Sequence, residues 1–169
     1  MLNTLKTTLG FLGAVLQKYT PLTFHGDSLE EVYNYLQIDE RIATSGQPTE
    51  AQFRLMPEAG YLRVINLAPQ SVLENSLTTE PELLAELGIE YTHIPVDFQA
   101  PGEQDFARFV EVMAAAGNDK VWVHCAANMR VSAFMYRYRR DVLQQPEGEI
   151  GEALARIWEP SAVWKKFLE

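Results

Sequence analysis

The 169-residue sequence contains a single cysteine, Cys125, so the chain cannot form an internal disulfide bond. Nothing in its folding therefore depends on an oxidising compartment. Histidine is scarce too, and the three residues His25, His93 and His124 are far apart in sequence. Because a protein-bound metal needs several His, Cys or acidic ligands at suitable spacing, the sequence predicts no metal site.

Positive charge is also in short supply, since 14 Lys and Arg residues face 23 Asp and Glu residues. The formal net charge of −9 argues against binding to nucleic acid or to an anionic membrane surface. Attraction for an anionic substrate must then be local. No apolar run is long enough to form an integral membrane span.

Residues 1–26 form an amphipathic N-terminal segment, in which Leu5, Leu9, Leu12 and Leu16 recur at helical spacing. We expect a helix that packs on the domain or on a partner, and pairing into a homodimer is one such arrangement. An export or membrane-surface role for residues 1–20 is the alternative, although 14–18 lacks a small-x-small cleavage site. We expect a cytoplasmic protein, with export or membrane association as the alternative.

Strands and helices alternate along residues 27–169. Apolar runs predict strands at 41–44, 62–67, 91–96 and 121–123. Helical periodicity and capping residues predict helices at 29–36, 50–56, 80–87, 104–116, 131–144 and 150–158. This order predicts one α/β domain with a mostly parallel sheet of about four to five strands, flanked by helices.

The segment 120–132 carries the chemistry. Cys125 follows the buried strand 121–123 and precedes a helix, so it lies where backbone N–H groups and the positive end of a helix dipole converge. That environment binds anions and favours thiolate over thiol. Arg130 adds a guanidinium that can grip a tetrahedral oxyanion through two donors.

His124, Cys125 and Ser132 match the His-Cys…Ser/Thr signature of the cysteine-dependent tyrosine and dual-specificity phosphatases, which this sequence resembles. Those enzymes place five residues between cysteine and arginine, whereas here Arg130 falls one position early and Val131 stands in the arginine position. The resulting Cys-x4-Arg spacing is typical of rhodanese-like sulfurtransferases. A loop with one fewer amide closes around a smaller group.

A second resemblance is to a bacterial group of uncharacterised phosphatase-like proteins, some fused to enzymes of sulfide metabolism. It is carried by the motifs at 45–49, 64–67 and 124–132 and covers most of residues 40–140. It implies a cysteine-phosphatase-like fold. It also implies that Ser45, Gly46 and Gln47 border the anion pocket, because they too follow a strand.

The expected roles follow from this resemblance and from the side chains. Cys125 would be the nucleophile and Arg130 the anion clamp. His124 would stabilise the loop or the thiolate, or simply be a satisfied histidine at a strand end. Ser132 would donate to the sulfur, or merely cap the helix. The loop amides that would hold the anion belong to Ala126, Ala127, Asn128 and Met129, and the Asn128 amide side chain would also hold the loop.

A phosphatase further needs an acid for the leaving oxygen. Asp97, on the loop 97–102 before the cysteine strand, is the candidate implied by the resemblance, with Glu103 and Asp105 as runners-up. We therefore expect a hydrolase of phosphate monoesters that needs no cofactor and acts on a phosphorylated small molecule or a phosphoprotein. A rhodanese-like sulfurtransferase or persulfide carrier, and a catalytically weak anion-binding pseudophosphatase, remain the alternatives.

Overall fold

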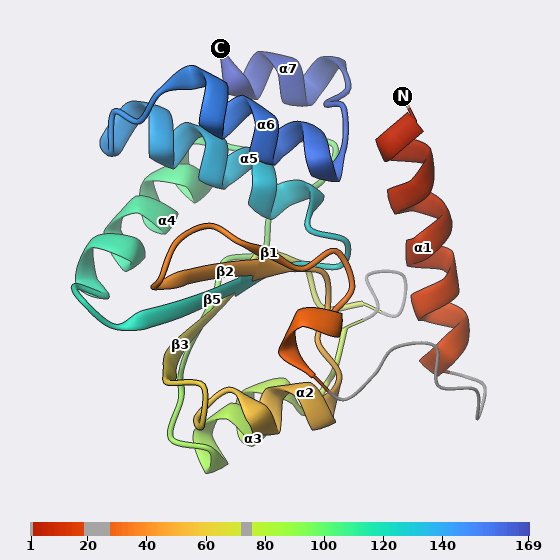
Figure 1. The fold of residues 1–169 in the computed structure, drawn as a ribbon, viewed down its shortest axis with the longest axis vertical. Helices are drawn as coiled ribbons and strands as arrows, with labels where there is room; N and C mark the ends of the chain where they lie inside the picture. The colour runs from red at the N-terminus through yellow and green to blue at the C-terminus, as the bar shows by residue number, and fades with distance from the viewer. Residues whose placement is uncertain (1, 19–27, 72–75) are drawn as a thin grey trace.

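A five-stranded sheet forms the centre of the computed structural model, which describes residues 2–18, 28–71 and 76–169 (Figure 1). The strand order is β1-β2-β5-β3-β4; β1 runs antiparallel to β2 and all other neighbours are parallel. The strands are β1 (Leu36–Gln37), β2 (Ile42–Ser45), β3 (Tyr61–Asn66), β4 (Glu90–His93) and β5 (Lys120–His124). The predicted single α/β domain with a mostly parallel sheet is confirmed.

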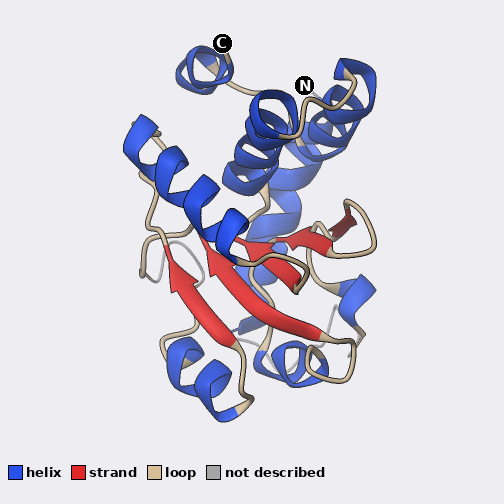
Figure 2. Ribbon diagram, turned by 90° about the vertical axis from the view of Figure 1, so that its left-hand side faces the viewer, coloured by secondary structure: helices blue, strands red, loops and turns tan. Residues whose placement is uncertain are grey.

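Helices cover both faces of the sheet (Figures 1 and 2). One face carries α2 (Glu50–Leu55) and α3 (Glu80–Glu86). The other carries α4 (Glu103–Ala115), α5 (Met129–Arg137), α6 (Glu147–Ile157) and α7 (Ala162–Leu168).

The central strand β5 is buried on both sides, as its unbroken apolar sequence requires. Val121 and Val123 join the larger core beneath α4–α7, whereas Trp122 joins the smaller core beneath α2 and α3. Because successive side chains of a strand alternate between faces, Cys125 continues the row of Val121 and Val123. The end of β5 is therefore held rigidly from both layers.

Three sequence-based boundaries were wrong. The expected helix 29–36 is only the 3-10 turn Leu29–Glu31, because Asn34 adopts a left-handed conformation with φ of 51° and the chain then enters β1. The strand expected at 91–96 ends at His93. The helix expected to reach residue 144 leaves α-helical geometry after Arg137 and continues as a π-helical turn, Tyr138–Val142.

The N-terminal helix α1 (Leu2–Lys18) packs on the domain, but with the face opposite to the expected one. Leu2, Leu5, Leu9 and Leu12 are 53–68% exposed. The inward face instead supplies hydrogen bonds to carbonyls at the end of α6: Asn3 Nδ2 to Ala155 O (2.7 Å) and Thr7 Oγ1 to Ile157 O (2.5 Å). Such carbonyls have no partner within their own helix, which explains why a polar face docks there.

The expected boundary of the N-terminal segment at residue 26 lies outside the described residues. Within the described ranges, no helix combines the length and apolarity needed to cross a membrane.

Candidate active site

Cys125 and Arg130 line one pocket of about 330 Å³ at the carboxyl end of β5. Cys125 is 1% exposed and lies at the base of the loop, while Arg130 is 4% exposed and is the second residue of α5. The guanidinium of Arg130 lies 5.2 Å from the ring centre of Phe98, which lines the same pocket. The described lining residues are Thr7, Thr8, Phe11, Phe98, Gln99, Cys125, Ala126, Ala127, Met129 and Arg130.

The loop is oriented by hydrogen bonds to its outward carbonyls. Ala126 O accepts from Gln47 N (3.3 Å), and Ala127 O accepts from Asn34 Nδ2 (3.0 Å). In a trans peptide the N–H points opposite to the C=O, so the amide of Ala127 is directed away from the contact between Ala126 O and Gln47 N. Because Ala126 and Ala127 line the pocket, the arrangement suits a nest of amides that holds an anion.

Asn128 closes the loop onto α5. Its φ of 64° is left-handed, a conformation that Asn tolerates better than most residues. Its Nδ2 donates to Asn34 O (2.8 Å) and to Thr44 Oγ1 (3.1 Å). The side-chain amide therefore fixes the turn from which the helix starts.

Ser45, Gly46 and Gln47 lie behind the loop and are absent from the described lining of the pocket, in contrast to the sequence expectation. Gly46 pairs with Ala127 in an isolated antiparallel bridge, and Cys125 N donates to Ser45 O (3.3 Å). The hydroxyl of Ser45 accepts from Trp122 Nε1 (2.8 Å) rather than facing the pocket. This motif supports the loop backbone from beneath.

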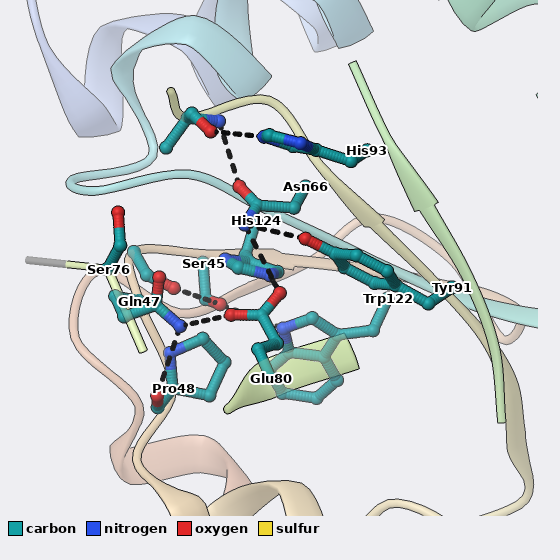
Figure 3. Close-up of polar contacts among 12 residues, drawn as sticks. Ser45, Gln47, Pro48, Asn66, Ser76, Glu80, Tyr91, His93, Trp122 and His124 are labelled. Atoms are coloured by element: carbon teal, nitrogen blue, oxygen red, sulfur yellow. Dashed lines mark hydrogen bonds and ion pairs between the residues drawn. The ribbon is translucent and has the colours of Figure 1, made fainter. Parts of the chain in front are cut away.

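His124 is fully buried and directed toward a carboxylate that sequence reasoning missed. Its Nε2 lies 2.9 Å from Glu80 Oε1, at the first residue of α3 (Figure 3). Glu80 also accepts from Gln47 Nε2 (2.8 Å) and Asn66 Nδ2 (3.1 Å). No local sequence signal pairs positions 44 residues apart, so this network is visible only in the fold.

The network sets the ionisation of Glu80. Burial alone raises the pKa of this carboxyl, but the charge of His124 and the hydrogen bonds from His124, Gln47 and Asn66 outweigh it, so the pKa lies below its usual 4.5. Glu80 is therefore a buried carboxylate with three donors.

Ser132 makes two hydrogen bonds of its own. Its hydroxyl donates to Met129 O (3.0 Å) and accepts from Trp158 Nε1 (3.2 Å). Since a hydroxyl has one hydrogen to donate, donation to the Cys125 sulfur would require the bond to Met129 to break.

Asp97 is exposed on the loop after β4, and its Oδ1 accepts from Gln99 N (2.8 Å). The next two residues, Phe98 and Gln99, line the pocket, and Trp164 Nε1 donates to Phe98 O (2.9 Å). Asp97 thus lies beside the pocket on an anchored loop. The runner-up Glu103 forms an ion pair with Arg137 (2.7 Å).

In the part of the chain that the structure describes, no three His, Cys, Asp or Glu side chains are grouped so that they could hold a metal ion. The polar groups that line the pocket are thus the thiol, the guanidinium, backbone amides and neutral side chains.

The fold is that of the cysteine-dependent phosphatases. A family model described as a DSP-PTPase phosphatase fused to NAD+ kinase matches residues 16–157, and the chain belongs to this family. A DUF442 protein from Shewanella putrefaciens, described as a candidate phosphatase, is similar with 33% identity and a TM-score of 0.74, covering 81% of this chain and 87% of that one.

More distant likeness concerns the fold. The catalytic core of the PP-IP phosphatase SIW14 from S. cerevisiae superposes with a TM-score of 0.67 at 15% identity, over 81% of this chain and 84% of that one. A β-lactamase hydrolase-like protein of Xylella fastidiosa is 32% identical over 97 residues, or 56% of this chain. The chain spans only about a fifth (22%) of the length of that relative.

We predict that Gly46→Ala distorts the loop. A Cβ at this position would lie 2.8 Å from Ala126 O and 2.8 Å from Tyr33 Cδ1, closer than atoms can pack without movement. We expect a loss of about 1–3 kcal/mol in unfolding free energy, measured by urea denaturation. Gly151→Ala is the control, since open space surrounds that helical position and the change should be neutral or stabilising. Equal effects at both positions would contradict the prediction.

We predict that Glu80 makes stability depend on acid pH. Because its folded-state pKa is lowered, its contribution is fully present above 4.5 and is lost as pH falls through the folded-state value. We would measure the free energy of unfolding by urea denaturation at pH 7 and at a series of pH values below 4.5. Between pH 7 and the acidic values, this free energy should fall less for Glu80→Gln than for the wild type. At pH 7 the variant should be about 1–3 kcal/mol less stable. The exposed Glu111→Gln should leave the wild-type profile intact.

Proposed function

We propose that this protein hydrolyses phosphate monoesters through a covalent cysteinyl-phosphate intermediate. The observation that carries the proposal is the joint lining of one pocket by Cys125 and Arg130 at the N-terminal end of α5. A thiolate, a guanidinium and inward amides are the groups that phosphoryl transfer at cysteine requires. Membership of the phosphatase family supports the same chemistry.

The reaction has two steps. Cys125 Sγ attacks phosphorus, the phosphorus–oxygen ester bond breaks, and a proton from an acid is transferred to the departing alcohol oxygen. Water then attacks phosphorus of the cysteinyl phosphate and gives a proton to the conjugate base of the same acid. The phosphorus–sulfur bond breaks, so the thiolate leaves with the electron pair and inorganic phosphate forms. Arg130 and the loop amides stabilise the charge on the equatorial oxygens in both steps.

Asp97 is our proposed acid. Its loop position beside Phe98 and Gln99 supports this role, because rotation of an exposed side chain on a pocket-lining loop brings it toward a bound ester. Its carboxylate accepts from Gln99 N, and this hydrogen bond would give way when substrate binds.

The Cys-x4-Arg spacing favours one rival reaction. In a sulfurtransferase, Cys125 would attack the outer sulfur of thiosulfate and release sulfite, and the resulting persulfide would pass its sulfur to cyanide or a thiol. The shorter loop supports this reading, and no general acid would be needed. Thiocyanate formation from thiosulfate and cyanide tests it.

We expect Cys125→Ser to abolish turnover of p-nitrophenyl phosphate, because an alkoxide does not form readily at this site. Arg130→Lys should lower kcat/KM by about 10²–10³-fold, since a single ammonium cannot replace two aligned donors. The exposed Arg108→Lys serves as the control and should behave as the wild type. Release of p-nitrophenol measures each rate.

Turnover that persists in Cys125→Ser would overturn the covalent mechanism. Thiocyanate production without phosphatase activity would favour the sulfurtransferase. Silence in both assays, with phosphate still bound, would leave an anion-binding pseudophosphatase.

We predict that Asp97→Asn slows phenyl phosphate more than p-nitrophenyl phosphate. Phenolate is a poor leaving group and needs protonation, whereas p-nitrophenolate leaves readily without it. The expected loss in kcat for phenyl phosphate is about 10²-fold. Asp105→Asn is the matched control. A loss that is equal for both esters, or that appears only in the control, would assign the acid elsewhere.

A further inference from the structure

The N-terminal helix α1 forms one wall of the catalytic pocket. Thr7, Thr8 and Phe11 line it opposite the loop residues, together with Phe98 and Gln99. The family model begins at residue 16, so these three side chains lie outside the matched region. The pocket is thus built partly by a segment that lies outside the region matched by the family model.

This wall is tied directly to the catalytic loop. Asn34 Nδ2 donates to Thr7 Oγ1 (3.2 Å) and also to Ala127 O (3.0 Å). Tyr33 OH donates to Thr7 O, and the same tyrosine ring lies against Gly10, where an added Cβ would be 2.7 Å from Tyr33 Cε2. Glycine at position 10 leaves room for the Tyr33 ring, and these contacts tie Thr7, the neighbour of Thr8, to the loop that carries Cys125.

The pocket is lined mostly by uncharged groups. Arg130 is the sole charged side chain among the described residues that line the pocket, apart from the thiol when ionised. Phe11, Phe98 and Met129 supply apolar surface around it, and Thr8 and Gln99 supply neutral polar groups. One guanidinium and the loop amides can balance one phosphoryl dianion, whereas a second anionic group would be left without a partner.

We propose that α1 determines the specificity of this site, and that Thr8 and Phe11 select monophosphate esters of uncharged, aromatic or apolar alcohols over esters that carry further negative charge. This inference rests on the proposed phosphatase activity. Phe11 contributes apolar contact with the alcohol part of the ester. Thr8 presents a neutral surface where a substrate with a second anion would need a cation.

The charge selection is tested with phenyl phosphate and 3-carboxyphenyl phosphate, whose phenols are leaving groups of similar acidity but differ by one carboxylate. Wild type should prefer phenyl phosphate in kcat/KM by about 10-fold or more, the effect of one unpaired charge in a partly screened site. Thr8→Lys should reduce this preference by about 5–10-fold. Leu9→Lys, which adds the same charge on the exposed outer face, should retain it.

The apolar contact is tested with Phe11→Ala. KM for phenyl phosphate should rise about 10-fold with kcat nearly unchanged, because the contact is made equally in the ground state and transition state. The inhibition constant of inorganic phosphate should stay at the wild-type value, since phosphate needs only the loop and Arg130. Leu9→Ala is the control, and circular dichroism checks that each variant keeps its helices.

The outcomes separate this inference from the proposed function. If the wild type turns over neither ester, the phosphatase proposal fails. If it turns over both, but Thr8→Lys leaves their ratio unchanged and Phe11→Ala leaves KM unchanged, the specificity role of α1 is overturned while the phosphatase proposal stands. A rise in the phosphate inhibition constant in Phe11→Ala would show that α1 supports the loop instead, which also overturns it.

Discussion

The outward anchoring of the loop carbonyls is the constraint on which the site depends. A peptide can offer its N–H to an anion only if its C=O finds a donor on the other side, because a buried carbonyl left without one is costly. Here Gln47 N and Asn34 Nδ2 are those donors, one from the motif after β2 and the other from the left-handed turn before β1. The scaffold around the loop is thus as much a part of the proposed anion site as the loop itself.

This constraint explains how the short loop still positions its arginine. Asn128 reverses the chain in one left-handed residue, and α5 starts immediately at Met129. Arg130 then lies in the first turn and reaches the pocket, while Val131, about 100° further round the helix, is buried in the core. Val131, which stands where a loop one residue longer would place its arginine, is therefore a core residue. The early start of α5 brings Arg130 to the pocket instead.

The sequence pattern around Cys125 predicted the part of the site that is built from neighbouring residues. Strand, loop and helix around Cys125 follow one another within 13 residues, so alternation and capping signals are enough to place the thiol and Arg130 together. The partners of the loop come from afar: Asn34 is 93 residues from Ala127, and Glu80 is 44 from His124. Asn34 even lay in an expected helix, since nothing in its neighbours signals the left-handed turn.

The N-terminal helix shows a second limit of pattern reading. An apolar stripe predicts the buried face of a helix only when burial of that stripe is the dominant gain in free energy. The leucines of α1 form such a stripe, but they are exposed. The terminal carbonyls of α6 need donors, and Asn3 and Thr7 provide them from the other face. Sequence periodicity cannot anticipate this choice, because the need for donors arises on another helix about 150 residues away.

The layer beneath the site contains a buried acidic side chain, Glu80. Glu80 contacts His124, the residue before the proposed nucleophile. A carboxylate so close to Cys125 would oppose both a thiolate and a bound phosphate dianion in a medium of low dielectric constant. Glu80 is buried there with a lowered pKa, and hydrogen bonds from His124, Gln47 and Asn66 stabilise its carboxylate. The groups that would favour an anion at Cys125 are the loop amides, the N-terminal end of α5 and Arg130.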